Sequence, residues 1–324
     1  MVNSSSRVIG RLKSVKWVSQ ENILVYITIA LFIVFSFIAS GFFNTINFFI
    51  LLRSMSIITV LGLGITFVIT TGEIDLSVGA VPAICGAVLA VLLQKGASLP
   101  AAIIAALAVA VIAGLVNGLV IVGTNLPGII VTLATSMIAT GIAYIVTKQA
   151  PVVVTNNIFM TLFGGDILGF PVIVIWMIAF LIISYILLHQ TKLGRNLCFI
   201  GENRTASFFA GIKVGPIFIL AFIISAVYAC IAGLLSIGQS SNASPWMLSG
   251  DMMTAIAATI IGGTSLSGGK GNVLGTVLGA FFLTMLSNGF LICGIPQWVL
   301  YLINGVVIIA ALSWRYMPGM GSKR

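Results

Sequence analysis

The chain has 324 residues, of which 60% are hydrophobic and only 6% are charged, and its mean hydropathy is +1.22. A soluble domain carries roughly 25% charged residues, so this composition excludes a soluble protein and indicates an all-α polytopic membrane protein in a lipid bilayer. The formal charge of +9 does not indicate a nucleic-acid partner, because the basic residues form no contiguous patch.

Ten apolar segments approach the roughly 20 residues that a helix needs to cross a bilayer. The eighth is doubtful, because its uninterrupted apolar run, residues 252–261, would rise only about 15 Å as a helix. It crosses only if its helix begins near Trp246 and includes Asp251; the alternative is a re-entrant hairpin, which would invert everything downstream. The ten segments are residues 23–40, 54–71, 77–94, 99–122, 126–147, 168–188, 216–237, 246–263, 273–292 and 298–314.

The positions of Lys and Arg distinguish these topologies, since basic residues accumulate on the cytoplasmic side. Ten spans with the N-terminus inside place twelve of the 15 basic residues inside and three outside, whereas a re-entrant eighth segment leaves eight inside and seven outside. We therefore predict about ten transmembrane helices with both termini cytoplasmic. The regions are a basic N-terminus (1–22), a transmembrane domain (23–314) and a tail (315–324).

The stretch IIGGTSLSGGKGNVLG (260–275) almost matches a phosphate-binding loop. That pattern requires Gly at 264 and Ser or Thr at 271, where the chain has Thr264 and Gly271, so the hydroxyl that would bind magnesium is missing. The preceding residues also do not resemble a buried strand. We predict no nucleotide or other cofactor on this chain and interpret the glycines, including Gly275 and Gly279, as sites of close helix packing.

Two carboxylates, Glu73 and Asp75, lie in TTGEIDLSVGA (70–80), between the second and third segments. Ionisable groups at membrane depth are costly, which favours a role in transport or partner contact. The alternative, which we favour on local grounds, is that Asp75 caps the third span and Glu73 interacts with the positive end of the same helix.

The inner loop, residues 189–215, is the most charged segment after the N-terminus. Asn203 is suited to cap a two-turn helix over 205–210, and Gly211 suits the left-handed position that follows it. Such a helix either docks on a partner protein or lies on the lipid headgroups with Phe208 and Phe209 buried. Amphipathicity alone favours the headgroup alternative.

Polar residues inside the segments, including Asn117, Thr132 and Asn288, either face an aqueous pathway or bridge two helices. For each of them taken singly, bridging is favoured. One histidine, four widely separated cysteines and no mid-membrane pair of acids provide neither a catalytic constellation nor a metal site, so no enzyme activity is expected.

Three stretches in order and with matching spacing closely resemble the permeases of ribose-, xylose- and allose-class bacterial ABC importers. They are TGEIDLSVGA (71–80), LGRNLCFIGENRTASFFAGIKV (193–214) and AATIIGGTSLSGGKGNVLGTVLGA (257–280). The resemblance implies a multi-pass subunit of the bacterial cytoplasmic (inner) membrane that carries a monosaccharide or similar small polar solute. It also implies a second permease copy, identical or similar, a separate ATPase that binds the ATP, and a periplasmic or lipid-anchored substrate-binding protein.

The resemblance further implies that residues 189–215 couple the chain to the ATPase, which reverses the preference for the headgroup alternative.

The chain departs from the family pattern at two places: Glu73 replaces a common glycine, and Arg204-Thr205 replace residues that are often acidic. Relatives that carry nucleosides, the furanose autoinducer-2 or branched-chain amino acids leave the solute class open. A secondary transporter or a scaffold subunit are further alternatives. The expected coupling residues are Gly194, Arg195, Gly201, Asn203, Ala206, Phe209, Gly211 and Ile212, and the pathway candidates are Glu73, Asp75, Asn117, Thr132 and Asn288.

Overall fold

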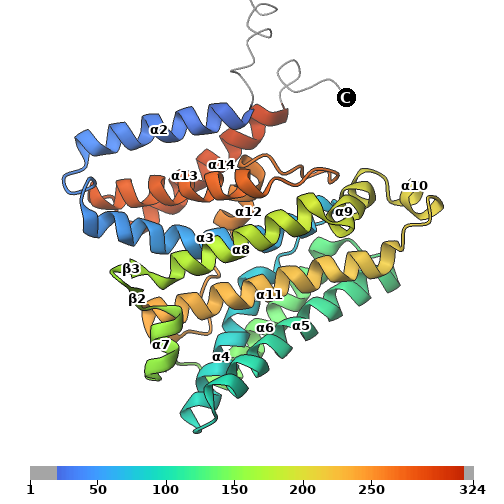
Figure 1. Cartoon of the computed structure of the whole chain (residues 1–324), viewed down its shortest axis with the longest axis horizontal. Coiled ribbons are helices and arrows are strands. Elements are labelled where there is room, and N and C mark those ends of the chain that lie inside the picture. The colour runs from blue at the N-terminus through green and yellow to red at the C-terminus, as the bar shows by residue number, and fades with distance from the viewer. Residues whose placement is uncertain (1–19, 317–324) are drawn as a thin grey trace, which may run out of the picture.

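The computed structural model describes residues 20–316 and is a bundle of long helices (Figure 1). Within these residues, seven helices are long and apolar enough to cross a membrane, which makes the chain a multi-pass membrane protein. They are α3 (Thr45–Thr70), α4 (Val81–Gln94) with the 3-10 turn Ser77–Gly79 before it, α5 (Leu99–Thr124), α6 (Gly128–Thr147), α8 (Val172–Tyr185) with the π-helical turn Ile186–Gln190 after it, α11 (Val214–Ser240) and α13 (Val273–Ile292).

Shorter apolar helices occupy the other three predicted segments: α2 (Gln20–Ile38), α12 (Asp251–Ile261) and α14 (Gln297–Tyr316). The second segment extends further than predicted, because α3 begins at Thr45 rather than at 54, with the Asn44 side chain accepting a hydrogen bond from the Ile46 N–H at 2.9 Å. The predicted basic N-terminal region up to residue 19 and the tail from residue 317 lie outside the described residues.

The eighth segment differs from its prediction. Its helix, α12, begins at Asp251, so the expected start near Trp246 is wrong. Leu248 has φ +57°, a left-handed conformation that a right-handed helix cannot include, and residues 245–250 form turns instead. As a consequence, α12 is only 11 residues long and rises about 16 Å.

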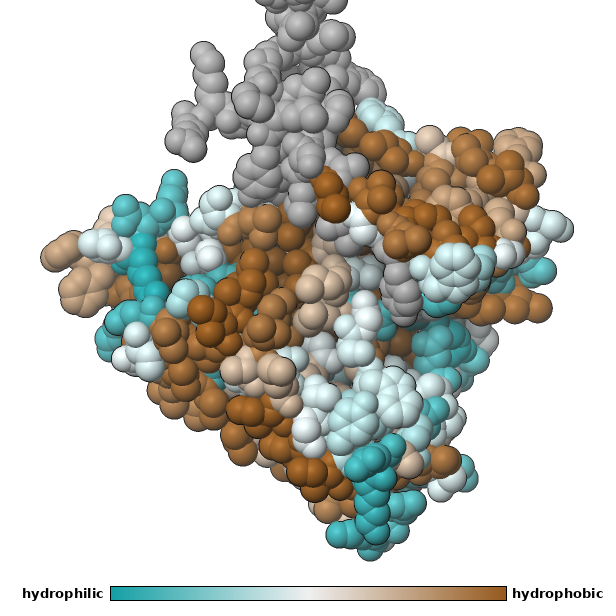
Figure 2. All heavy atoms as spheres, turned by 180° about the vertical axis from the view of Figure 1, so that it is seen from behind, coloured by the Kyte–Doolittle hydropathy of each residue, from teal (hydrophilic) through white to brown (hydrophobic). Residues whose placement is uncertain are grey.

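Helices α3 and α11 form the centre of the bundle, and α3 packs against α8, α11, α12 and α13 (Figure 1). Their close approach depends on glycine, because a Cβ atom at Gly64 of α3 would lie 2.6 Å from Cβ of Tyr228 in α11. Gly114 of α5 meets the backbone of Phe222 in the same way. Figure 2 shows the complementary outer surface, a broad hydrophobic band between hydrophilic ends, as a lipid-facing protein requires.

One end of the bundle carries small elements between α6 and α8 and after α11. Strand β1 (Val152–Val153) pairs antiparallel with β4 (Asn242–Ala243), and β2 (Asp166–Ile167) pairs with β3 (Phe170–Pro171). Helix α7 (Asn157–Phe163) lies between them, and Asp166 forms an ion pair with Arg53 of α3. The opposite end carries α9 (Lys192–Glu202) and α10 (Arg204–Phe209) (Figure 1).

Candidate functional site: a glycine junction and a polar cavity

The three sequence motifs meet at the α9 end of the bundle. The Gly269 N–H donates a hydrogen bond of 3.0 Å to the carbonyl oxygen of Thr70, the last residue of α3. Gly201 of α9 fits against the same two residues so closely that a Cβ atom there would overlap the Thr70 oxygen and lie 2.5 Å from the Gly269 nitrogen. Gly268 completes this glycine junction, because a Cβ atom there would lie 2.8 Å from the Gly72 nitrogen.

Helix α10 forms as the sequence predicts, one residue earlier at its start. The Asn203 side chain accepts a hydrogen bond from the Ala206 N–H at 2.9 Å, which confirms Asn203 as the cap. Gly211 adopts φ +81°, and the N–H groups of Gly211 and Ile212 bond the carbonyls of Phe208 and Ser207, as in a Schellman motif.

Two further contacts hold the α9–α10 pair against the bundle. The Arg204 guanidinium lies 4.8 Å from the ring centroid of Phe218 in α11, a cation–π distance. Gly194, near the start of α9, fits against the backbone of Leu188, which a Cβ atom would overlap. The pair therefore contacts the spans at the start of α9 and again at the start of α10.

The outward face of α9 and α10 is aromatic and hollowed. Phe199, Phe208 and Phe209 are 54%, 66% and 81% exposed. Beside them lies a groove of about 570 Å³, lined by Asn196, Phe199, Glu202, Asn203, Ala206, Ser207, Ala210 and Ile212. Three of the predicted coupling residues, Asn203, Ala206 and Ile212, line it; Arg195, Phe209 and Gly211 are exposed, whereas Gly194 and Gly201 pack against backbone.

Cys198 lies on α9 and is half-buried. Burial raises the pKa of its thiol above the ordinary value, and the nearby Glu202 charge raises it further, while a hydrogen bond from the Gly271 backbone lowers it. The thiol is therefore mostly protonated at neutral pH.

Four of the five predicted pathway residues gather around the break between α3 and α4. Asp75 is fully buried, and its Oδ1 accepts hydrogen bonds from the Ser77 N–H (2.9 Å) and hydroxyl (2.5 Å). Its Oδ2 accepts one from the Ser225 hydroxyl of α11 at 2.8 Å, and Asn117 of α5 donates to the Ser77 hydroxyl at 2.9 Å. Asp75 thus caps the turn that leads into α4, as the local interpretation predicts.

Glu73 has a different partner from the predicted one. Its Oε2 accepts a hydrogen bond of 2.8 Å from the Gly128 N–H at the first turn of α6, so it interacts with the positive end of α6 and not with that of α4. The neighbouring Thr132 hydroxyl accepts from the Leu76 N–H at 3.0 Å. The tertiary fold brings α6 to this turn, which explains why local reasoning chose the wrong helix.

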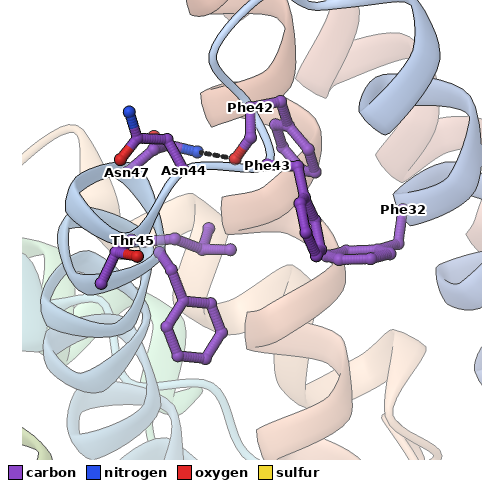
Figure 3. A pocket seen from close by; sticks show the side chains of 8 residues that line it. Phe32, Phe42, Phe43, Asn44, Thr45 and Asn47 are labelled. Carbon is purple, nitrogen blue, oxygen red and sulfur yellow. Dashed lines mark hydrogen bonds between the residues drawn. The ribbon is translucent and has the colours of Figure 1, made fainter.

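Asn288, the fifth candidate, lies elsewhere. It exchanges two hydrogen bonds with Asn47 of α3, of 3.1 and 2.9 Å, and therefore bridges two helices. Asn47 also donates to the Phe42 carbonyl at 2.9 Å and lines a mostly aromatic pocket of about 320 Å³ at the turn between α2 and α3 (Figure 3).

A second cavity, of about 270 Å³, has a polar lining and includes none of the five pathway candidates. It lies among α3, α11, α12, α13 and the first residue of α14, towards the β1–β4 end. Asp251 contributes the only acidic group of its described lining. The lining residues are Ser54, Ile57, Ile58, Ser236, Gln239, Leu248, Gly250, Asp251, Thr254, Thr284, Ser287 and Gln297.

A family model described as the permease component of the branched-chain amino acid transport system matches residues 47–312. The chain belongs to this family. A ribose import permease protein from Escherichia coli (strain K12) is 32% identical over 300 residues, 91% of this permease and 93% of the relative. The ribose import permease protein of Bacillus subtilis (strain 168) is 34% identical, over 87% and 88% of the two chains, and a D-allose transport system permease protein of Escherichia coli (strain K12) is 34% identical, over 86% of each. No solved structure matches.

In this permease, local signals located helix α10, its caps and the Asp75 cap. They did not locate the polar cavity, although Asp251 was visible as the acid that the eighth segment would have to include. The cavity takes its polar side chains from five helices, and no spacing along a single helix reveals their convergence.

Proposed function

We propose that the permease is the transmembrane subunit of an ATP-driven importer that moves a monosaccharide or a similar small polar solute into the cell. The observation that carries the proposal is the exposed aromatic face of α9 and α10 on a pair of helices fixed rigidly to the spans. Aromatic residues, phenylalanine included, are enriched at protein interfaces relative to the rest of the surface. The relatives named for ribose and allose import support the solute class.

The glycine junction is the mechanical reason to place the ATPase at this face. Gly201 touches Thr70 and Gly269 through backbone atoms, with no flexible side chain between them. A force applied to α9 therefore moves the end of α3 and the loop between α12 and α13 directly, because packed backbones do not deform continuously. Rocking of these spans would alternate access to a central pathway.

The loop over 262–272 supports placing the ATP on the partner subunit. The Ser265 N–H bonds the Lys270 carbonyl, the Gly268 N–H bonds the Ser265 carbonyl, and the Gly269 N–H bonds Thr70. A phosphate-binding loop instead directs such N–H groups at its ligand. We accordingly expect no nucleotide or other cofactor on this chain.

The proposed topology has ten crossings with both termini and the α9 end cytoplasmic, in the bacterial cytoplasmic membrane. Helix α12 is too short to cross by itself, but its connections support a crossing by the eighth segment together with the turns before the helix, since the segment follows β4 at one end and leads to the glycine junction at the other. The β1–β4 end would then face outwards, where a substrate-binding protein delivers the solute. A second permease copy, identical or similar, completes the pathway.

Co-isolation from the native host tests the assembly. A tagged permease is expected to purify with a stoichiometric ATP-binding-cassette protein, and Phe209→Asp is expected to lose it while remaining inserted in the membrane. Ile158→Asp is the matched control, because Ile158 is 64% exposed but lies on α7 at the opposite end. A wild-type chain that purifies alone under conditions that preserve known importers would favour a secondary transporter.

A further inference from the structure

Asp75 and Asp251, two acids of the bundle, differ in what their carboxylates contact. Both oxygens of Asp75 are occupied by hydrogen bonds from Ser77 and Ser225. Asp251, by contrast, makes no side-chain hydrogen bond or ion pair with the side chains and backbone that the structure describes. A carboxylate without such partners in an apolar bundle costs free energy, of which the positive end of α12 offsets only a part, so the group is available to an occupant of the cavity.

Other polar residues border this cavity. The buried Thr284 hydroxyl of α13 has no hydrogen-bond partner among the described residues. The amides of Gln239 and Gln297 enter from α11 and α14, and the Ser54 and Thr254 hydroxyls from α3 and α12. Amides and hydroxyls both donate and accept hydrogen bonds, whereas the carboxylate only accepts.

The charge of the lining distinguishes between solute classes. No Lys, Arg or His is among the described residues that line this cavity, and the start of α12, which borders it, already carries the Asp251 carboxylate. The carboxylate of an amino acid would therefore meet a like charge at that helix end. A sugar carries only neutral hydroxyl groups, which donate to a carboxylate and exchange hydrogen bonds with amides. Ile57, Ile58 and Leu248 supply an apolar surface for the C–H face of a sugar ring. The volume of about 270 Å³ lies near the lower limit of small-molecule pockets, about 300 Å³, and suits one ring rather than two.

We propose that this cavity is a binding site for a single uncharged polyhydroxylated solute, with the Asp251 carboxylate accepting hydrogen bonds from its hydroxyl groups. The proposal rests on the importer function and adds the residues that recognise the solute. Thr284 and the amides of Gln239 and Gln297 bind the remaining hydroxyls. Ala258 and Gly262 of α12, towards its other end, pack against Gly279 and Gly275, so the helix that carries Asp251 also leads to the glycine junction.

The test uses the complete importer, with its ATPase and binding protein, in proteoliposomes, and measures ATP-driven uptake of a panel of pentoses, hexoses and branched-chain amino acids. For the sugar carried by the wild type, Asp251→Asn and Thr284→Val are each expected to raise KM, Asp251→Asn by about tenfold to a hundredfold, the usual effect of losing a hydrogen bond to a charged group. Thr161→Val is the matched control for Thr284→Val, since Thr161 lies on α7 at the same end and does not line the cavity.

Analogues of the transported sugar that lack one hydroxyl provide a second measurement. If one hydroxyl donates to Asp251, its removal weakens uptake by the wild type but has little further effect on Asp251→Asn.

ATPase co-isolation and size-exclusion profiles show whether each variant is folded and assembled. Unchanged KM in assembled Asp251→Asn overturns the binding site and leaves the importer function standing. Wild-type uptake of amino acids but of no sugar overturns the solute class in both proposals, and an ATPase that does not assemble overturns the importer function itself.

Discussion

Gly201 of α9 lies directly against the carbonyl oxygen of Thr70 at the end of α3, with no room for a side chain between them. Gly201→Ala is therefore expected to push α9 away from the spans, destabilising the permease by about 1–3 kcal/mol as overpacking does, and to uncouple ATP hydrolysis from uptake. Gly141→Ala on α6 is the control, because a Cβ atom there meets nothing within 4 Å. Thermal unfolding and uptake measure the two effects, and wild-type values for both in Gly201→Ala would remove the coupling role of the junction.

Asn203 tests whether the conformation of α10 matters separately from its surface. Asn203→Ala removes the hydrogen bond to the Ala206 N–H and is expected to destabilise α10 by about 1 kcal/mol, whereas Asn203→Asp keeps an acceptor at the cap. Amide hydrogen exchange over residues 204–209 is expected to accelerate in the first variant and not in the second. Equal exchange in both would mean that the contacts of Arg204 and the Gly211 end hold the helix without its cap.

Gly275 and Gly279 pack α13 onto α12. A Cβ atom at either glycine would overlap a carbonyl of α12, that of Gly262 or of Ala258. Gly279→Ala is expected to separate the two helices and cost about 1–3 kcal/mol, although alanine is intrinsically the better helix former. Gly123→Ala on α5, where nothing lies within 4 Å of a Cβ atom, is expected to be neutral or stabilising. Higher thermal stability of Gly279→Ala than of the wild type would contradict this packing.

The Asp75 network predicts non-additive mutations. Asp75→Asn replaces an acceptor of three hydrogen bonds with a group that has one oxygen, so a buried donor loses its partner at a cost of about 1–3 kcal/mol. Because Ser225→Ala removes one of those donors, the double variant is expected to be less destabilised than the sum, by roughly 0.5 kcal/mol or more. Unfolding free energies of the two single variants and the double variant provide the cycle, and strict additivity would indicate that the serine and the carboxylate do not interact.

Cys198 predicts a dependence on pH. Since burial raises the pKa of its thiol, the reactive thiolate forms only at higher pH, and alkylation by iodoacetamide is expected to keep accelerating beyond the ordinary thiol pKa of about 8.5. The measurement uses a variant in which Cys85, Cys230 and Cys293 are replaced by serine, so that only Cys198 reacts. A rate that levels off below pH 8.5 would contradict the raised pKa.

The sequence by itself determined the features whose causes lie within one or two helical turns. These features depend on residues that are adjacent in the chain. They are the ten apolar segments, each long enough or nearly long enough to cross a bilayer, the Asn203 cap, the Gly211 turn and the Asp75 cap. The tertiary structure decided what depends on the register between helices: that Glu73 reaches α6, that α12 starts only at Asp251, and that Gly201 supports the end of α3. It also decided the polar cavity, because backbone contacts at glycines set how far each helix slides along its neighbour, and that sliding determines which side chains from five helices face one another.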